Sequence, residues 1–349
     1  MSEPSLDEKI GQMIMLGFRG LTVDADSDIA QDIHERHIGS VVLFNYDVAR
    51  GEYGRNIQSP EQVQALTAAL QENAQIPLLV AVDQEGGYVN RLRMEDGFPP
   101  TVSAQHLGEL DDVEVTRQHA ETVASTLASL GINFNLAPCV DLNLNPENPV
   151  IGAVERSFSA DPGKVVRHAA VWIDAHRAHG VRTCIKHFPG HGSSLGDTHD
   201  GFTDVTNTWT EIELEPFVTL LERRRCDAIM TSHIFNANLD PQLPATLSHR
   251  IIVGLLREQM GYSGVVVSDD LGMRAISSSY SFETGVELAV KAGVDILAMG
   301  RNTKREIENV PDTATRALNH IRHLVETGEI GEERIDRSYR RIQRLKQPE

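Results

Sequence analysis

Eight short runs of apolar residues recur along the chain, and they constrain the fold more than any other feature. They are rich in Val, Ile and Leu and are nearly continuous rather than alternating, which is typical of strands buried on both faces. The runs are GQMIMLGF (11–18), IGSVVLFN (38–45), PLLVAVDQE (77–85), NFNLAPCVD (133–141), VRTCIKHF (181–188), CDAIMTSHIF (226–235), GVVVSDD (264–270) and VDILAMG (294–300).

Amphipathic segments lie between these runs, and several begin with Ser or Asp and end at Gly, as capped helices do. Clear examples are 59–74, 111–131, 161–180 and 281–294. Strands alternating with helices predict an α/β fold, a (β/α)8 TIM-type barrel. An open doubly wound sheet is the alternative, but no GxGxxG pattern follows the first run. We expect a single barrel domain over 1–349, with a closing C-terminal helix at about 332–347.

The charge balance argues against several classes of partner. The chain has 50 acidic and 32 basic residues and a formal net charge of −18. Binding to nucleic acid or to an anionic membrane is not expected, because both need a positive surface. The first residues, MSEPSLDEKIGQMIML, lack a basic start and a long apolar stretch. No secretory signal is therefore visible, and a cytoplasmic location is the default expectation.

Ionisable residues follow the apolar runs at their C-terminal ends, which is where a barrel carries its active site. A single such residue would be explained by a cap or a rim ion pair. Six runs with the same ending instead indicate a site, because charges at a barrel mouth are costly unless they are used. The residues at these ends are Asp83, Gln84 and Glu85, Asp141, Lys186 and His187, His233, Asp269 and Asp270, and Arg301.

This mixture of side chains suits a sugar. Asp and Arg side chains can hydrogen-bond pairs of hydroxyl groups, and a carboxylate on a strand end can attack an anomeric carbon. A second group must then protonate the departing oxygen. The sequence thus predicts a glycosidase-like site at the C-terminal end of the barrel.

Five motifs sharpen this prediction, and together they resemble the family 3 glycoside hydrolases, more narrowly the NagZ-type β-N-acetylglucosaminidases. The motifs are VDQEGG (82–87) with Arg91 nearby, RSF (156–158), KHFPGHG (186–192), DTH (197–199) and SDDLGM (268–273). They occur in the family's order and cover about the first 300 residues. The resemblance implies a retaining β-N-acetylhexosaminidase that removes terminal β-linked GlcNAc without a cofactor.

The same resemblance implies roles for individual residues. Asp269 corresponds to the nucleophile, and alternation along the strand supports Asp269 over Asp270. His199 corresponds to the general acid and base, with Asp197 as its partner in the dyad. The residues expected to hold the sugar are Asp83, Arg91, Arg156, Lys186 and His187, with His233 as a further pocket residue.

The acid–base loop is expected to move. A free imidazole is mostly unprotonated at neutral pH, and Asp197 can favour the imidazolium form by hydrogen bonding the other ring nitrogen. Gly190, Gly192 and Gly196 flank the dyad. We expect these glycines to let the loop carry His199 toward bound substrate.

Two other readings of the same residues are open. His187, His191, His199 and His233 with Asp269 could hold a metal, as in amidohydrolase-like barrels, but the first run ends in GFRG and offers no HxH pair. We therefore expect no metal.

Inorganic phosphate is the second alternative. A histidine acid–base group would not repel phosphate as a carboxylate would, so a β-N-acetylglucosaminide phosphorylase fits the same residues. The natural substrate also stays open between a GlcNAc-containing muropeptide fragment and a chitin oligosaccharide.

Overall fold

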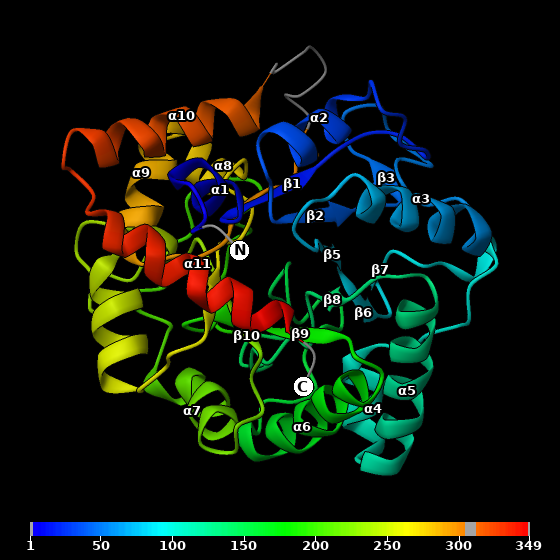
Figure 1. Ribbon diagram of the computed structural model, residues 1–349. Helices are drawn as coiled ribbons and strands as arrows, with labels where there is room; N and C mark the ends of the chain where they lie inside the picture. The colour runs from blue at the N-terminus through cyan, green and yellow to red at the C-terminus, as the bar shows by residue number, and fades with distance from the viewer. Residues whose placement is uncertain (1–2, 304–311, 348–349) are drawn as a thin grey trace.

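The computed structural model describes residues 3–303 and 312–347. Eight parallel strands form its centre, in the order β11-β10-β9-β8-β5-β2-β1-β12. A parallel bridge between Val267 and Ile296 joins the two ends of this order. The sheet therefore closes on itself, and the helices surround it (Figure 1). This confirms the predicted (β/α)8 barrel. The expectation of one domain over 1–349 also covers 1–2, 304–311 and 348–349, which lie outside the described residues.

Each strand lies inside one of the eight predicted apolar runs. The strands are β1 (Ile14–Gly17), β2 (Ser40–Leu43), β5 (Leu79–Val82), β8 (Phe134–Asn135), β9 (Arg182–Phe188), β10 (Ala228–Thr231), β11 (Val265–Val267) and β12 (Leu297–Met299). Their residues are buried apart from Arg182 at the start of β9. The ionisable residues of the other runs follow the ends of β5, β8, β10, β11 and β12, whereas Lys186 and His187 lie within β9.

The main helices are α2 (Asp28–Glu35), α3 (Pro60–Glu72), α5 (Val113–Ser129), α6 (Pro162–Ala178), α7 (Glu215–Glu222), α9 (Phe282–Ala292), α10 (Thr313–Glu326) and α11 (Glu332–Lys346), with a π-helical segment at Arg250–Gln259. Caps fix where the predicted helices begin. Ser59 accepts a hydrogen bond from the Gln62 N–H at the start of α3, and Ser281 accepts one from the Thr284 N–H at the start of α9.

Shorter elements complete the chain. They are the helices α1 (Leu6–Gly11), α4 (Ala104–Leu110) and α8 (Arg274–Ser277), the 3-10 turns at Met94–Asp96, Glu211–Leu214 and Ala245–Leu247, and the hairpins β3 (Tyr46–Asp47) with β4 (Glu52–Tyr53) and β6 (Gln84–Gly86) with β7 (Val89–Asn90). Among the described residues, no helix is both long and apolar enough to cross a membrane.

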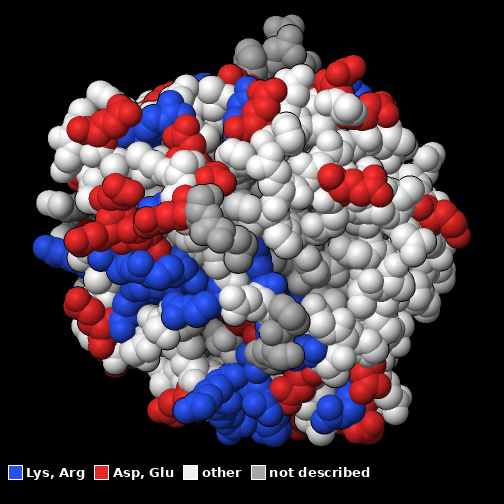
Figure 2. All heavy atoms as spheres, viewed as in Figure 1, with Lys and Arg blue, Asp and Glu red and all other residues white. Residues whose placement is uncertain are grey.

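Helix α11 packs across the N-terminal end of the barrel. The Arg182 side chain at the start of β9 donates to the Leu345 carbonyl (3.1 Å). The buried Asp295, just before β12, accepts from Ser338 and Arg341 of α11. Figure 1 shows α11 running across this end of the barrel. Figure 2, from the same direction, shows basic side chains gathered on part of this face beside acidic ones.

Candidate active site

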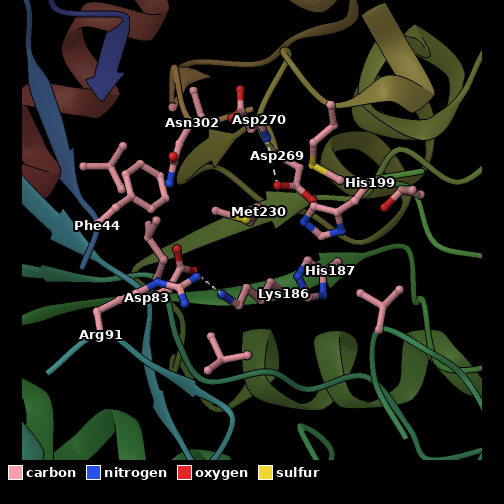
Figure 3. A pocket seen from close by; sticks show the side chains of 18 of the residues that line it. Phe44, Asp83, Arg91, Lys186, His187, His199, Met230, Asp269, Asp270 and Asn302 are labelled. Atoms are coloured by element: carbon pink, nitrogen blue, oxygen red, sulfur yellow. Dashed lines mark hydrogen bonds and ion pairs between the residues drawn. The ribbon is translucent and has the colours of Figure 1, made fainter. Parts of the chain in front are cut away.

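A cavity of about 310 Å³ opens at the C-terminal ends of the strands. This size lies at the lower end of the range for small-molecule sites. Most of the predicted site residues line it: Asp83, Arg91, Arg156, Lys186, His187, His199 and Asp269. Asp83, Arg91 and Lys186 lie toward one side, and Asp269 and His199 toward the other (Figure 3). The walls between them include apolar side chains such as Phe44 and Met230.

Asp269 follows β11 and faces the cavity. Its Oδ1 accepts the backbone N–H of Asp270 (2.8 Å). Burial alone would raise the pKa of this carboxyl, but the nearby His233, His187 and His199 outweigh burial and lower the pKa to about 2. Asp269 is therefore an ionised carboxylate over the whole physiological range.

Asp270 also borders the cavity but has different partners. Its Oδ1 accepts the Gly272 N–H (2.9 Å), and its carbonyl oxygen lies 2.9 Å from His233 Nε2. Burial raises the pKa of the Asp270 carboxyl. This carboxyl therefore stabilises the turn after β11, which supports Asp269 as the reactive carboxylate.

His199 and Asp197 lie together on the loop after β9. Their contact is 2.7 Å between His199 Nδ1 and Asp197 Oδ1, and the same oxygen accepts the His199 N–H (2.7 Å). The Asp197 hydrogen bond raises the pKa of His199 against the opposing effect of burial. The His199 side chain is 62% exposed. Because Nδ1 is engaged by Asp197, Nε2 is the nitrogen that remains for a ligand in the cavity.

The glycines of this loop meet tight packing in its first part. A Cβ on Gly192 would lie 1.8 Å from the Leu142 carbonyl oxygen, and one on Gly190 would lie 2.5 Å from Glu213 Cβ. At Gly196, the nearest atom would be a Thr203 side-chain oxygen at 3.2 Å. Gly190 and Gly192 thus allow Glu213 and Leu142 to pack directly against the loop backbone. Movement of His199 stays a prediction and would involve the later part of the loop.

A network of ion pairs lies at the opposite side of the cavity. The Lys186 Nζ lies 2.6 Å from Asp83 Oδ1 and 2.7 Å from Glu85 Oε1. Arg156 pairs with both Glu85 oxygens (2.9 and 2.7 Å). Burial is the largest influence on Glu85, yet Arg156 and Lys186 overcome it and hold the pKa of Glu85 well below its usual range. Sequence reasoning gave Glu85 no role, although its position in VDQEGG beside Asp83 was a signal.

Arg156 has little hydrogen-bonding capacity left for a sugar. A guanidinium has five N–H donors, and Arg156 directs four of them to the two Glu85 oxygens, the Val150 carbonyl (3.0 Å) and His187 Nε2 (3.1 Å). Because Arg156 can only donate, His187 Nε2 accepts and Nδ1 carries the proton. This proton is donated to Asp141 Oδ2 at 2.6 Å.

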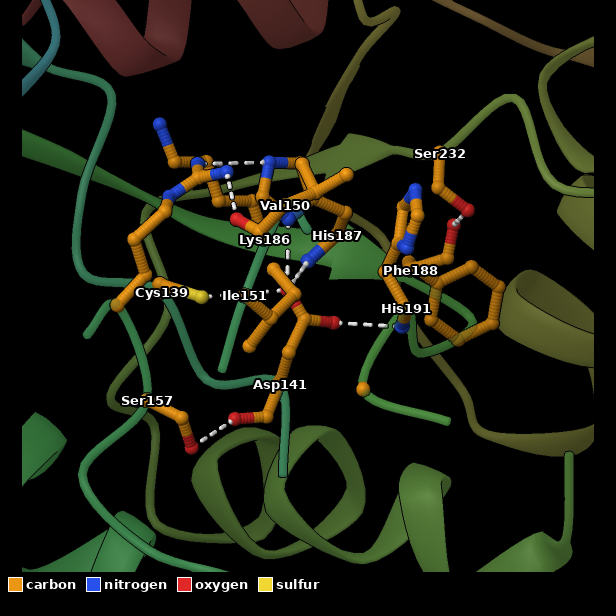
Figure 4. Close-up of polar contacts among 12 residues, drawn as sticks. Cys139, Asp141, Val150, Ile151, Ser157, Lys186, His187, Phe188, His191 and Ser232 are labelled. Carbon is orange, nitrogen blue, oxygen red and sulfur yellow. Dashed lines mark hydrogen bonds and ion pairs between the residues drawn. The ribbon is translucent and has the colours of Figure 1, made fainter. Parts of the chain in front are cut away.

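Asp141 joins the sugar-holding side of the cavity to the acid–base loop. Besides His187, it accepts the backbone N–H of His191 (2.7 Å) and the Cys139 thiol (3.2 Å) (Figure 4). The pKa of this buried carboxyl is about 2, because His187 and His191 more than offset burial. Its position at the end of the fourth run was noted from the sequence, but its partners were not.

The remaining two predicted residues differ in placement. Arg91 lines the cavity, and its Nε is buried without a hydrogen-bond partner among the described residues. His233 does not line the cavity. Its ring nitrogens contact Thr246 Oγ1 and the Asp270 carbonyl, both at 2.9 Å. His233 therefore lies behind Asp269 and Asp270 rather than in reach of a sugar.

Within 3–303 and 312–347, one group of side chains has the spacing of metal ligands. Its members are Cys139, Asp141 and His187, whose ligand atoms lie within 4.8 Å of one another. These atoms already share hydrogen bonds around Asp141 Oδ2. A cation would have to replace those hydrogens beside the Arg156 guanidinium. His199, His233 and Asp269, considered as ligands from the sequence, form no such group in this part of the chain.

Comparison with known proteins decides the family. The family model described as "Glycosyl hydrolase family 3 N terminal domain" matches residues 5–345. The chain belongs to glycosyl hydrolase family 3. Relatives in this family include Beta-hexosaminidase A of Pseudoalteromonas piscicida, 32% identical over 97% of the chain, and Beta-hexosaminidase of Tolumonas auensis, 32% identical over 83%. The chain spans 60% of the first relative's length and 83% of the second's.

Solved structures of the family agree with the fold. A β-N-acetylglucosaminidase from Paenibacillus sp. is 38% identical, with a TM-score of 0.88 over 99% of this chain and 63% of its own. Beta-N-acetylhexosaminidase from Beutenbergia cavernae is 30% identical, with a TM-score of 0.86 over 99% of both chains. The family 3 barrel described here thus matches both longer and similar-sized members.

Proposed function

We propose that this chain is a retaining β-N-acetylglucosaminidase, which removes terminal β-linked GlcNAc from a small oligosaccharide. The observation that carries the proposal is the arrangement of Asp269 and His199. An ionised carboxylate and an imidazole with a raised pKa line the same cavity, opposite a polar network around Lys186. The names of the family 3 relatives point to the same substrate.

In the first step, a carboxylate oxygen of Asp269 attacks the anomeric carbon. The bond to the glycosidic oxygen breaks, and His199 Nε2 gives its proton to that oxygen. The raised pKa of His199 favours the protonated imidazolium that this step needs. Asp197 stabilises the imidazolium before the transfer and orients the ring through Nδ1.

In the second step, neutral His199 removes a proton from water. The water oxygen attacks the anomeric carbon, and the bond to Asp269 breaks with the electron pair returning to the carboxylate. Two displacements at one carbon retain its configuration. Asp83, Arg91 and Lys186 would hold the sugar hydroxyl groups during both steps.

The test uses two β-N-acetylglucosaminides, an aryl glycoside with a good leaving group and chitobiose. Asp269→Ala should abolish turnover of both, whereas His199→Ala should mainly reduce kcat/KM for chitobiose, by roughly 100- to 10,000-fold. Turnover by Asp269→Ala at the parent rate would refute the nucleophile. An equal loss for both substrates in His199→Ala would refute the general acid.

Phosphate is a second candidate acceptor, because the group at the acid–base position is an imidazole and not a carboxylate. In that case a phosphate oxygen attacks the anomeric carbon and Asp269 departs, giving the sugar 1-phosphate. Turnover measured in phosphate and in phosphate-free buffer, with detection of sugar 1-phosphate, separates the two reactions. The aglycone, muropeptide or chitin fragment, and the cytoplasmic location stay predictions.

A further inference from the structure

Glu213 lies directly beneath the loop that carries Asp197 and His199. It belongs to the 3-10 turn Glu211–Leu214 and is 1% exposed. Its Oε2 accepts the backbone N–H of Gly192 (2.8 Å), and its Oε1 accepts the Ser193 hydroxyl. The Glu213 side chain also fills the space over Gly190, where a Cβ could not fit.

Burying a carboxyl in this position costs folding free energy unless hydrogen bonds or ion pairs compensate for the lost hydration. No ion pair with a cation involves Glu213 in the described part of the chain, and the nearby Asp141 is also acidic. Burial raises the pKa of Glu213 to about 7, despite the hydrogen bonds from the loop. An apolar side chain would fill the same volume at lower cost, so the two hydrogen bonds to the loop account for the carboxyl.

The part of the loop that Glu213 holds continues to the acid–base pair through further contacts. His191 Nδ1 lies 2.8 Å from Ser194 Oγ, and its Nε2 lies 3.4 Å from Thr198 Oγ1. The Thr198 carbonyl accepts the Ala275 N–H (3.2 Å). Since Thr198 separates Asp197 from His199 in the sequence, the segment 190–198 forms one braced unit that ends at the dyad.

We propose that Glu213 is a positioning residue for the acid–base dyad: its two hydrogen bonds to Gly192 and Ser193 hold the loop so that His199 reaches the glycosidic oxygen. The inference rests on the proposed glycosidase function. It predicts a selective defect, because misplacing the acid hinders departure of a poor leaving group far more than departure of a good one.

The experiment compares kcat/KM for chitobiose with kcat/KM for an aryl β-N-acetylglucosaminide bearing a good leaving group. Glu213→Ala should lower the first value roughly 10- to 100-fold and the second less than about threefold. Ser193→Ala removes only the hydrogen bond from the Ser193 hydroxyl to Glu213. It should lower kcat/KM for chitobiose selectively as well, but by a smaller factor. Glu213→Gln should retain near-parent selectivity, because its oxygen can accept from Gly192 and its NH₂ can donate to Ser193.

Glu211→Ala is the matched control, since this exposed carboxylate lies in the same 3-10 turn. Ser193→Ala and Glu213→Gln keep the test decisive if Glu213→Ala does not fold. Equal losses on both substrates, or no loss in either Glu213→Ala or Ser193→Ala, would overturn the positioning role. If the parent protein turned over neither substrate, the proposed function itself would fail, which is a different result.

Discussion

Removing the Glu85 carboxylate should destabilise the whole barrel, and the structure allows the size of the effect to be worked out. Glu85, Arg156 and Lys186 have side chains only 4%, 9% and 2% exposed. Glu85→Ala leaves the Arg156 guanidinium without its carboxylate partner, while Lys186 keeps Asp83. Breaking a buried pair by removing one member costs about 3–5 kcal/mol.

This free energy converts into a measurable shift of the melting temperature. The entropy of unfolding scales with length and is roughly 0.7 kcal/mol per degree for a chain of 349 residues. Glu85→Ala should therefore lower Tm by about 4–7 °C. It should also reduce kcat/KM at least roughly tenfold, because Lys186 and Arg156 lose their fixed positions.

The assay is thermal unfolding followed by circular dichroism, with Glu95→Ala as the control at an exposed carboxylate. The double variant Glu85→Leu with Arg156→Met should recover most of the lost Tm but not the activity, because apolar side chains can replace a buried pair. The difference in Tm between the parent and Glu85→Ala should also shrink as pH falls below 4.5, the usual Glu pKa. Below that pH the unfolded state gains a proton that folded Glu85 resists, so the ionised carboxylate stabilises the parent less. A Tm within about 1 °C of the parent at pH 7 would refute this account.

Three further predictions concern the acid–base loop. Asp197→Asn should lower the pKa of His199 and move the alkaline limb of the kcat/KM profile for chitobiose to lower pH, since His199 donates only below its pKa; Asp200→Asn should leave the limb in place. Glu213→Gln should raise Tm relative to the parent at and above pH 7 but little near pH 4.5. Between these values the unfolded carboxyl has ionised while the folded one keeps its proton, so the parent loses stability as pH rises from 4.5 to about 7. Gly192→Ala should lower both Tm and activity, because its Cβ meets the Leu142 carbonyl, whereas Gly196→Ala should be tolerated.

The barrel was predictable from the sequence because each strand is buried on both faces. A run such as VVV at Val265–Val267 has no polar face, so its burial and its strand form are visible in the residue types. The ends of the strands were equally visible, since Lys186 directly follows the apolar Ile185 and Asp269 comes one residue after the VVV run. Local patterning was thus enough to find the mouth of the barrel and most of its lining.

The supporting residues could not be found in this way. Glu85 and Arg156 are 71 positions apart, and nothing local to either shows that they pair. Glu213 reads as one acidic residue among several at a helix start, yet packing against Gly190 buries it. His233 ends an apolar run like the other site residues, but the Asp270 carbonyl and Thr246 occupy its nitrogens. These three placements depend on contacts between residues far apart in the sequence, which local sequence patterns do not show.

The position of α11 has a practical consequence for how the molecule can be handled. Its last residues contact the start of β9, at the end of the barrel opposite the cavity. A tag or reporter joined after α11 would therefore emerge on the side away from substrate. When the protein is attached to a solid support through such a tag, the substrate cavity should face the solution. An attachment near Leu195 or Phe202, both exposed on the acid–base loop, should instead obstruct the mouth.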